Sequence, residues 1–209
     1  NQKAPILKKL LDTVVNASEF YHKYKSYKSL DDFPIINKLT IKENFDTINI
    51  LPNTSKDIVK VSSSGSTGIP FSIYWTKKKA IRNKADVIFY ANSAGYTIGD
   101  QLLFVRLWSK KYRKHFFIKK ALNLVQVDIE SLTDKNIATF IANIKSEKHP
   151  KGFIGYPSGF EKICNYLDKI KSPPLDCNIQ SIIATSETLY DNVREKMAYY
   201  FKAPVVSRY

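Results

Sequence analysis

Short apolar runs alternate with segments of helical periodicity over the last half of the chain, and this alternation constrains the fold more than any other feature. Five runs have the composition of strands, at 101–106, 122–128, 153–155, 179–184 and 203–206. Helical spacing lies between the later runs, at 134–145, 158–170 and 191–201. Such alternation predicts parallel βαβ units and an α/β fold, a mostly parallel sheet flanked by helices. Because ligands bind beyond the carboxyl ends of such strands, residues that directly follow a strand are the candidates for function.

The first part of the chain has a different pattern. Apolar residues recur at helical spacing over 4–15. Thr40 and Glu43 have the spacing of a capping box and predict the start of a further helix. Two strand-like runs, 58–61 and 71–75, then flank a loop and predict a hairpin.

A helix is predicted directly after this hairpin, over 77–94. Thr76 is its expected N-cap, and Gly95 ends it as a glycine just past a helix does. Its expected apolar face consists of Ala80, Ala85, Ile88 and Phe89. We therefore divide the chain into a helical N-terminal segment over 1–56 and an α/β domain over 57–209.

Composition excludes several classes of protein. The 209 residues are 44% hydrophobic and 25% charged, which excludes general disorder. No apolar run approaches the roughly 20 residues of a membrane-spanning helix, and the first residues have no signal-peptide pattern. Cys164 and Cys177 form neither a disulfide framework nor a CxxC pair, and the three histidines lie far apart. We therefore expect no metal site among these residues and a cytoplasmic location.

Two of the glycines lie in a loop of small residues, Ser62 to Pro70, with the sequence SSSGSTGIP. The backbone of such a loop can approach a phosphate closely and donate several N–H groups to it. The loop is not a Walker motif, because no Lys-Ser/Thr pair follows the second glycine, and it is not a dinucleotide fingerprint, because a strand follows it. The alternative interpretation is a flexible hairpin turn.

A series of short segments carries a resemblance to a known family. The segments are SSGSTGIP at 63–70, FPIINK at 33–38, GYTIGD at 95–100, YPS at 156–158, ATSETL at 184–189 and SRY at 207–209. The first resembles the phosphate loop of the adenylate-forming enzymes, the superfamily of acyl-CoA synthetases. The others are similar, in the same order, to segments of one branch, the phenylacetate–CoA ligases and the CapK-type capsular polysaccharide proteins.

The resemblance implies an ATP-dependent ligase. In this family a carboxylic acid and ATP form an acyl-adenylate and pyrophosphate, and coenzyme A usually then displaces AMP. The implied small molecules are ATP with Mg²⁺, coenzyme A and a carboxylic acid, and an anionic saccharide is a further candidate acceptor. The branch also suggests a role in capsular polysaccharide biosynthesis. A homodimer is left open.

The resemblance also assigns candidate site residues. The phosphate-binding candidates are Ser63, Ser64, Gly65, Ser66, Thr67 and Gly68. The candidates for the adenine nucleotide are Thr185, Ser186, Glu187, Thr188 and Tyr209. The candidates for an acyl or coenzyme A pocket are Trp108, Tyr156, Pro157 and Ser158. For the aromatic residues the alternative is a place in the core, and for Glu187 it is the capping of the helix that follows.

The sequence departs from the family pattern at its end. It stops at Tyr209, inside a family motif, before the glutamate that would bind Mg²⁺, the aspartate that would hold the ribose and the small C-terminal domain with its adenylation lysine. We therefore expect an N-terminal portion of such an enzyme that is inactive alone. A non-catalytic binding module that keeps the fold is the second hypothesis.

Positive charge is concentrated in the middle of the chain. The net charge is +14, and residues 61–120 carry 12 basic against 2 acidic residues. Two stretches, 77–84 and 106–120, contain no acid, and aromatic residues interleave with the second. Such stretches predict an anionic partner. As the anionic partner we rank coenzyme A or an anionic saccharide first and a membrane surface second. Nucleic acid ranks third and is disfavoured. The alternative to any anionic partner is that these basic residues form a solvated helix face.

Overall fold

The structure of the protein is a computed structural model that describes residues 3–51, 56–62, 72–108 and 112–208. Its contacts divide the chain into two compact units, Asn1–Lys84 and Ala85–Tyr209. The boundary expected after residue 56 stays a prediction. No helix among the described residues is long and apolar enough to cross a membrane.

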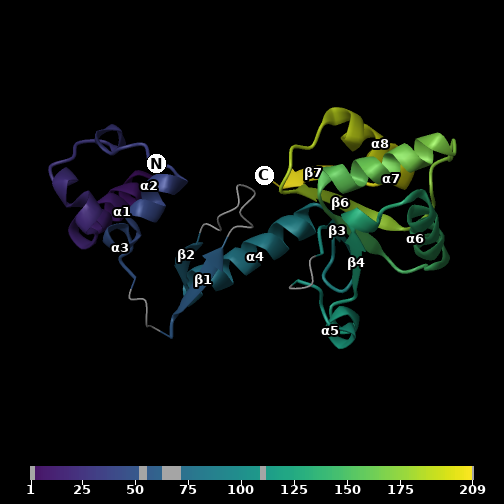
Figure 1. Cartoon of the computed structure of the whole chain (residues 1–209), viewed down its shortest axis with the longest axis horizontal. Coiled ribbons are helices and arrows are strands. Elements are labelled where there is room, and N and C mark those ends of the chain that lie inside the picture. Colours follow the sequence, from purple (N-terminus) through teal and green to yellow (C-terminus); the bar gives the residue numbers. More distant parts are fainter. Residues whose placement is uncertain (1–2, 52–55, 63–71, 109–111, 209) are drawn as a thin grey trace. The chain divides into compact units, whose positions relative to one another are not determined.

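The first unit is mainly helical, and it is completed by a hairpin and the first part of the helix that follows the hairpin (Figure 1). Its elements are α1 (Lys3–Ala17), the 3₁₀ helices η1 (Glu19–Tyr24) and η2 (Leu30–Asp32), α2 (Lys38–Glu43), α3 (Phe45–Ile48), β1 (Ile58–Ser62) and β2 (Ser72–Thr76). Helix α1 confirms the periodicity over 4–15, and it buries Leu11 and Val15. The Ser18 hydroxyl donates to the Thr47 carbonyl at 2.8 Å and so ties the end of α1 to α3.

The capping box predicted at Thr40 is wrong. Helix α2 begins one turn earlier, because the side-chain oxygen of its N-cap Asn37 accepts a hydrogen bond from the Thr40 N–H at 2.9 Å. Thr40 therefore lies inside the first turn, and Glu43 is the last residue of the helix. Asn37 and Thr40 are both suitable N-cap residues. Asn is as good an N-cap as Thr, and Asn37 comes first in the chain.

The predicted hairpin is confirmed for its two strands. β1 and β2 are antiparallel, from Ile58 opposite Thr76 to Ser62 opposite Ser72. The Thr76 hydroxyl accepts a hydrogen bond from the Lys79 N–H at 3.1 Å, as predicted for the N-cap of α4 (Lys77–Ser93). The loop between the strands, residues 63–71, lies outside the described residues.

Helix α4 ends where predicted but does not bury its expected apolar face. Gly95 follows it with a positive φ of 93°, the left-handed conformation that glycine favours. No residue of this fully described helix is buried, and Phe89 is 65% exposed. The expected packing of Ile88 and Phe89 is therefore wrong in this structure.

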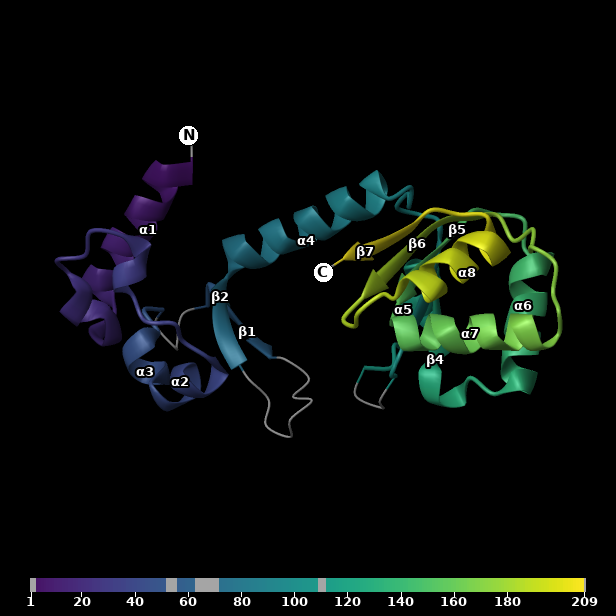
Figure 2. The same cartoon turned by 90° about the horizontal axis from the view of Figure 1, so that it is seen from above.

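The second unit is a parallel sheet covered by helices (Figures 1 and 2). Its strands are β3 (Gln101–Arg106), β4 (Leu124–Asp128), β5 (Lys151–Gly155), β6 (Ile179–Thr185) and β7 (Val205–Arg208), and its helices are α5 (Phe116–Ala121), η3 (Ile129–Ser131), α6 (Asp134–Ser146), α7 (Pro157–Lys169) and α8 (Asp191–Phe201). The strand order is β4-β3-β5-β6-β7, and every neighbouring pair is parallel. The predicted α/β fold is confirmed.

Helices α6, α7 and α8 share one hydrophobic core with the sheet. β3 shows why: its side chains alternate, and Leu103 and Val105 are fully buried in this core. Phe153 of β5 contacts Phe160 of α7 and Phe201 of α8 through ring pairs at 5.9 and 5.0 Å. This packing sets the position of the turn that leads from β5 into α7.

Two glycines allow the end of β5 and the first turn of α7 to approach β3 closely. A Cβ at Gly155 would lie 2.4 Å from the Val105 carbonyl oxygen, and a Cβ at Gly159 would lie 2.5 Å from Val105 Cγ1. A larger side chain would push β5 away from β3 at Gly155, and α7 away from β3 at Gly159. The N-terminus of α7 is therefore held beside the carboxyl end of β3.

Candidate functional site

The strand order places a switch point between β3 and β5. The chain leaves β3 for the edge strand β4 on one side, and later continues to β5 on the other side of β3. In open α/β sheets with this order, the crevice at the carboxyl ends of the two strands is where ligands bind. The residues that follow β3 and β5, including Trp108 and Tyr156–Ser158, are therefore at the expected position for a site.

The turn after β5 is joined to the segment after β6. The Ser158 backbone N–H and hydroxyl both donate to the Glu187 carboxylate, at 2.9 and 3.1 Å. Pro157 occupies the first turn of α7, so Ser158 presents one of the unpaired N–H groups of a helix start. Glu187 places a negative charge at this positive helix end, which is stabilising.

This contact changes the interpretation of Glu187. The alternative from the sequence was that it caps the helix that follows, which is α8. The N-cap residue of α8 is Tyr190, without a side-chain cap. Glu187 instead bonds to α7, the helix before it in the chain.

The segment after β6 turns sharply at Ser186. Ser186 has a positive φ of 70°, a left-handed conformation that is rare for a residue with a side chain. Thr185 is half-buried and pairs in register with Arg208 of β7, while Ser186 and Thr188 are exposed. Thr185, Ser186 and Thr188 therefore lie at the carboxyl end of β6. Tyr209 lies outside the described residues.

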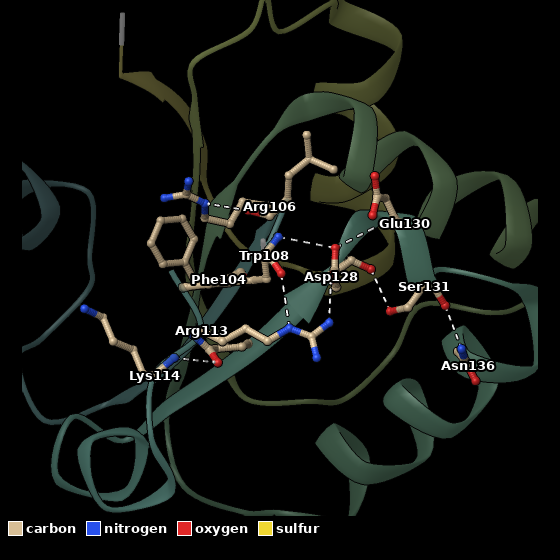
Figure 3. Close-up of polar contacts among 11 residues, drawn as sticks. Phe104, Arg106, Trp108, Arg113, Lys114, Asp128, Glu130, Ser131 and Asn136 are labelled. Carbon is tan, nitrogen blue, oxygen red and sulfur yellow. Dashed lines mark hydrogen bonds and ion pairs between the residues drawn. The ribbon is translucent and has the colours of Figure 1, made fainter. Parts of the chain in front are cut away.

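Trp108, which follows β3, is mostly enclosed. Its side chain is only 6% exposed, and its indole N–H donates to the Phe104 carbonyl at 3.1 Å. Its backbone N–H donates to Asp128 Oδ1 at 3.4 Å. The Arg113 guanidinium donates to the Trp108 carbonyl at 3.1 Å and to Asp128 Oδ2 at 3.2 Å (Figure 3). The indole can therefore support the residues that line the site, but it offers little exposed surface to a ligand.

Arg106 is a residue at this edge that the motifs do not single out. Its guanidinium lies over the rings of Phe104, Trp108 and Tyr112, at 5.6, 5.2 and 5.4 Å from their centres. It also donates to the Leu107 carbonyl at 3.2 Å. The period-two spacing of Phe104, Arg106 and Trp108 on one strand face is the sequence signal that could have found this cluster.

The structure brings together some predicted site residues and leaves others undescribed. The Tyr156 N–H donates to the Val105 carbonyl at 2.9 Å, so the turn after β5 adjoins the end of β3. Tyr156 is half-buried, Pro157 is buried and Ser158 is exposed. The phosphate-loop candidates, 63–68, lie outside the described residues.

Titratable groups in the described part of the chain offer no metal cluster and no activated thiol there. Among these residues no group of three or more His, Cys, Asp or Glu could hold a metal ion. Cys164 and Cys177 are free and buried, and burial raises the pKa of both thiols, that of Cys164 to about 12. A thiol with a raised pKa is a poor nucleophile.

Comparison with known proteins gives structural relatives only. No family model matches the chain, and no curated protein matches it. A crystal structure of 2-hydroxyisobutyryl-CoA ligase in complex with 2-HIB-AMP and CoA, in the thioesterification state, is similar over 96% of this chain and 46% of that one, with a TM-score of 0.63 and 18% identity. An open conformation of that ligase, also with 2-HIB-AMP and CoA, gives a TM-score of 0.60 and 19% identity over 97% and 52%.

These matches establish the class of fold. The chain has the α/β fold found in that adenylate-forming CoA ligase and spans about half of its length. The fold agrees with the resemblance seen in the motifs.

Proposed function

We propose that this chain is the N-terminal part of an ATP-dependent acid ligase that forms an acyl-adenylate and then an acyl-CoA. One observation carries the proposal. The Ser158–Glu187 contact joins the segment that the motifs assign to the acyl or coenzyme A pocket to the segment that they assign to the adenine nucleotide. It does so at the carboxyl ends of the strands, where α/β folds bind ligands. The shared fold of 2-hydroxyisobutyryl-CoA ligase, whose structures hold 2-HIB-AMP and CoA, supports it.

Each segment has a proposed role. The loop over 63–68 would bind the phosphates of ATP through its backbone N–H groups and stabilise the pyrophosphate that leaves. Thr185–Thr188 and Tyr209 would border the adenine. Tyr156, Pro157 and Ser158 would line the pocket for the acid or for coenzyme A, with Trp108 behind them.

Other parts of the proposal rest on the sequence. A Mg²⁺ ligand and the adenylation lysine would come from residues outside these 209, so we propose that this chain alone binds nucleotide without forming the adenylate. The CapK-like motifs are the support for a role in capsular polysaccharide synthesis. The two cysteines, Cys164 and Cys177, are free thiols, and this supports a cytoplasmic location.

Calorimetric titration with ATP·Mg²⁺ and with AMP tests this function. The 209-residue chain and any longer gene product that contains it should both bind, and only the longer protein should release pyrophosphate when an acid is added. Gly65→Val should abolish binding, because a side chain there blocks close approach of the backbone to phosphate. Ser146→Val, at the exposed end of α6, is the control and should bind normally.

The results separate the hypotheses. Nucleotide binding by both proteins without pyrophosphate release by either would favour a binding module over a ligase. Absence of nucleotide binding in both proteins, or unchanged binding by Gly65→Val, would contradict the proposed phosphate loop.

A further inference from the structure

The segment around α5 exposes apolar and basic side chains together. We define the α5 surface by six basic or apolar residues that are exposed or half-buried, namely Lys114, Phe116, Phe117, Lys119, Lys120 and Leu122. Phe116, Phe117 and Leu122 are 63%, 72% and 56% exposed. Figure 1 shows α5 projecting from the sheet, apart from the layer of α6, α7 and α8.

Helix α5 gains little stability from burial of its own side chains. It has six residues and buries none of them. An isolated helix of this length is unstable in water, and neighbouring exposed aromatic rings leave a large apolar area in contact with solvent. A partner that covers these rings would stabilise the helix.

Charge indicates the kind of partner. Residues 106–122 contain no acid, so no carboxylate of the segment balances its lysines. Elsewhere in the second unit lysines do have carboxylate partners, such as Lys169 with Asp134 and Lys196 with Asp168, each at 2.6 Å. No such ion pair involves Lys119 or Lys120 among the residues that the structure describes. The partner is therefore expected to be both apolar and anionic.

The rings are arranged for insertion rather than for base stacking. Phe117 stacks on His115 at 5.4 Å with an angle of 25°, and its other neighbour Phe116 meets it edge-on at 5.8 Å. His115 covers one face of Phe117, so a base could stack on that face only by displacing His115. A lipid surface requires no free ring face, because it accepts aromatic side chains at the headgroup level while lysines reach the phosphates.

We propose that the α5 surface docks on a membrane surface that contains anionic lipid, with Phe116 and Phe117 inserted and Lys119 and Lys120 near the headgroups. This binding mode does not depend on the proposed ligase activity. It is peripheral, because a short basic and apolar segment binds reversibly and depends on lipid charge.

Sedimentation with vesicles tests the proposal. The 209-residue chain is mixed, at about 0.15 M salt, with vesicles of phosphatidylcholine alone or of phosphatidylcholine with phosphatidylglycerol. We expect binding to the anionic vesicles only. The double variant Phe116→Ser/Phe117→Ser should bind at least about tenfold more weakly, because it removes the apolar insertion. Lys119→Glu/Lys120→Glu should also lose about tenfold or more, because each nearby charge contributes to attraction.

Matched controls separate this surface from general effects of charge and apolarity. Ile170→Ser/Tyr190→Ser removes two exposed apolar side chains elsewhere in the second unit, and Lys135→Glu/Lys148→Glu reverses two exposed lysines there. Both should bind the anionic vesicles like the unaltered chain. All altered residues are exposed or half-buried, and circular dichroism checks that each variant is folded.

Several results would overturn the proposal. They are binding of a single-stranded oligonucleotide without binding of anionic vesicles, unchanged vesicle binding by the serine variant, and equal loss in the controls. Vesicle binding is also measured for any longer gene product that contains the chain. Loss of binding there would show that another part of the protein covers α5 and would likewise overturn the proposal.

Discussion

Glu187 accepts two hydrogen bonds from Ser158, from the backbone N–H at 2.9 Å and from the hydroxyl at 3.1 Å. The two residues are 29 positions apart in the chain and belong to the segments after β6 and β5. One carboxylate therefore caps α7 and holds the neighbouring loop of the candidate site against it. The stability of this part of the protein and the shape of the site depend on the same contact.

Removal of this contact should destabilise the second unit. We expect Glu187→Ala to lower the free energy of unfolding by about 1 kcal/mol, as loss of a helix cap does. Ser158→Ala removes only the hydroxyl and should cost less. The double variant should cost less than the sum of the two, because both changes break one shared interaction. Urea denaturation measures all three.

Glu195→Ala, on the exposed side of α8, is the matched control and should change stability by less than about 0.5 kcal/mol. Additive effects of Glu187→Ala and Ser158→Ala would contradict the contact.

The sequence predicts most of the strands and helices of the second unit but not this contact. The strands from β3 to β7 and helices α6, α7 and α8 follow from apolar periodicity, which depends only on neighbouring residues. The Ser158–Glu187 pair depends on β5 and β6 being adjacent, a property of sheet order that periodicity does not contain. Helix α5 was not predicted, because its sequence FFIKKA has no apolar face of helical spacing.

Local chemistry was also ambiguous where two residues could take the same role. Asn37 and Thr40 are both good N-caps, and only the structure shows that Asn37 begins α2. Trp108 could face a ligand or the core, and the sequence alone cannot separate these because both suit an aromatic side chain. The structure buries its side chain, with the indole N–H paired to the Phe104 carbonyl.

Gly155 at the end of β5 and Gly159 in the first turn of α7 should resist substitution to different degrees. A Cβ at Gly155 meets the Val105 carbonyl, a backbone atom that cannot move alone, so Gly155→Ala should cost about 3 kcal/mol. A Cβ at Gly159 meets a methyl group of Val105, and alanine favours the helix by about 1 kcal/mol. Gly159→Ala should therefore cost only about 1 kcal/mol in net terms.

A second substitution tests these two causes. Val105→Ala removes the methyl groups, so it should offset part of the effect of Gly159→Ala but little of the effect of Gly155→Ala. Urea denaturation of the single and double variants measures the coupling. Equal rescue in both backgrounds would show that the backbone contact at Gly155 is not the cause.

The two cysteines should be unreactive in the folded chain. Burial raises the pKa of Cys164 to about 12 and raises that of Cys177 as well, so neither forms the thiolate at neutral pH. A thiol-reactive disulfide reagent should label neither residue before unfolding and both in urea. Ser146→Cys, at an exposed position, supplies a control thiol that should react at once. Fast labelling of the unaltered native chain would contradict the burial.

The pair of helices α7 and α8 should respond to pH at both ends of the scale. Asp168 of α7 accepts hydrogen bonds from Lys196 and Tyr200 of α8, both at 2.6 Å. The bonds from Lys196 and Tyr200 lower the pKa of Asp168 below its ordinary value of 3.8. Burial, followed by the bond to Asp168, raises the pKa of Tyr200 from 10.0 to about 12.

The two shifts act in opposite directions along the pH scale. The lowered pKa of Asp168 contributes stability that is present above pH 3.8 and is lost as pH falls through the folded-state value. The raised pKa of Tyr200 contributes stability that is present below pH 10.0 and is lost as pH rises towards about 12.

Tyr200→Phe should therefore flatten the alkaline side of a plot of unfolding free energy against pH. Asp168→Asn should flatten the acid side, and part of the alkaline side too, because it removes a cause of the Tyr200 shift. Glu195→Gln, on the exposed side of α8, should leave both sides unchanged, and an unaltered acid side in Asp168→Asn would show that this carboxylate does not hold the two helices together.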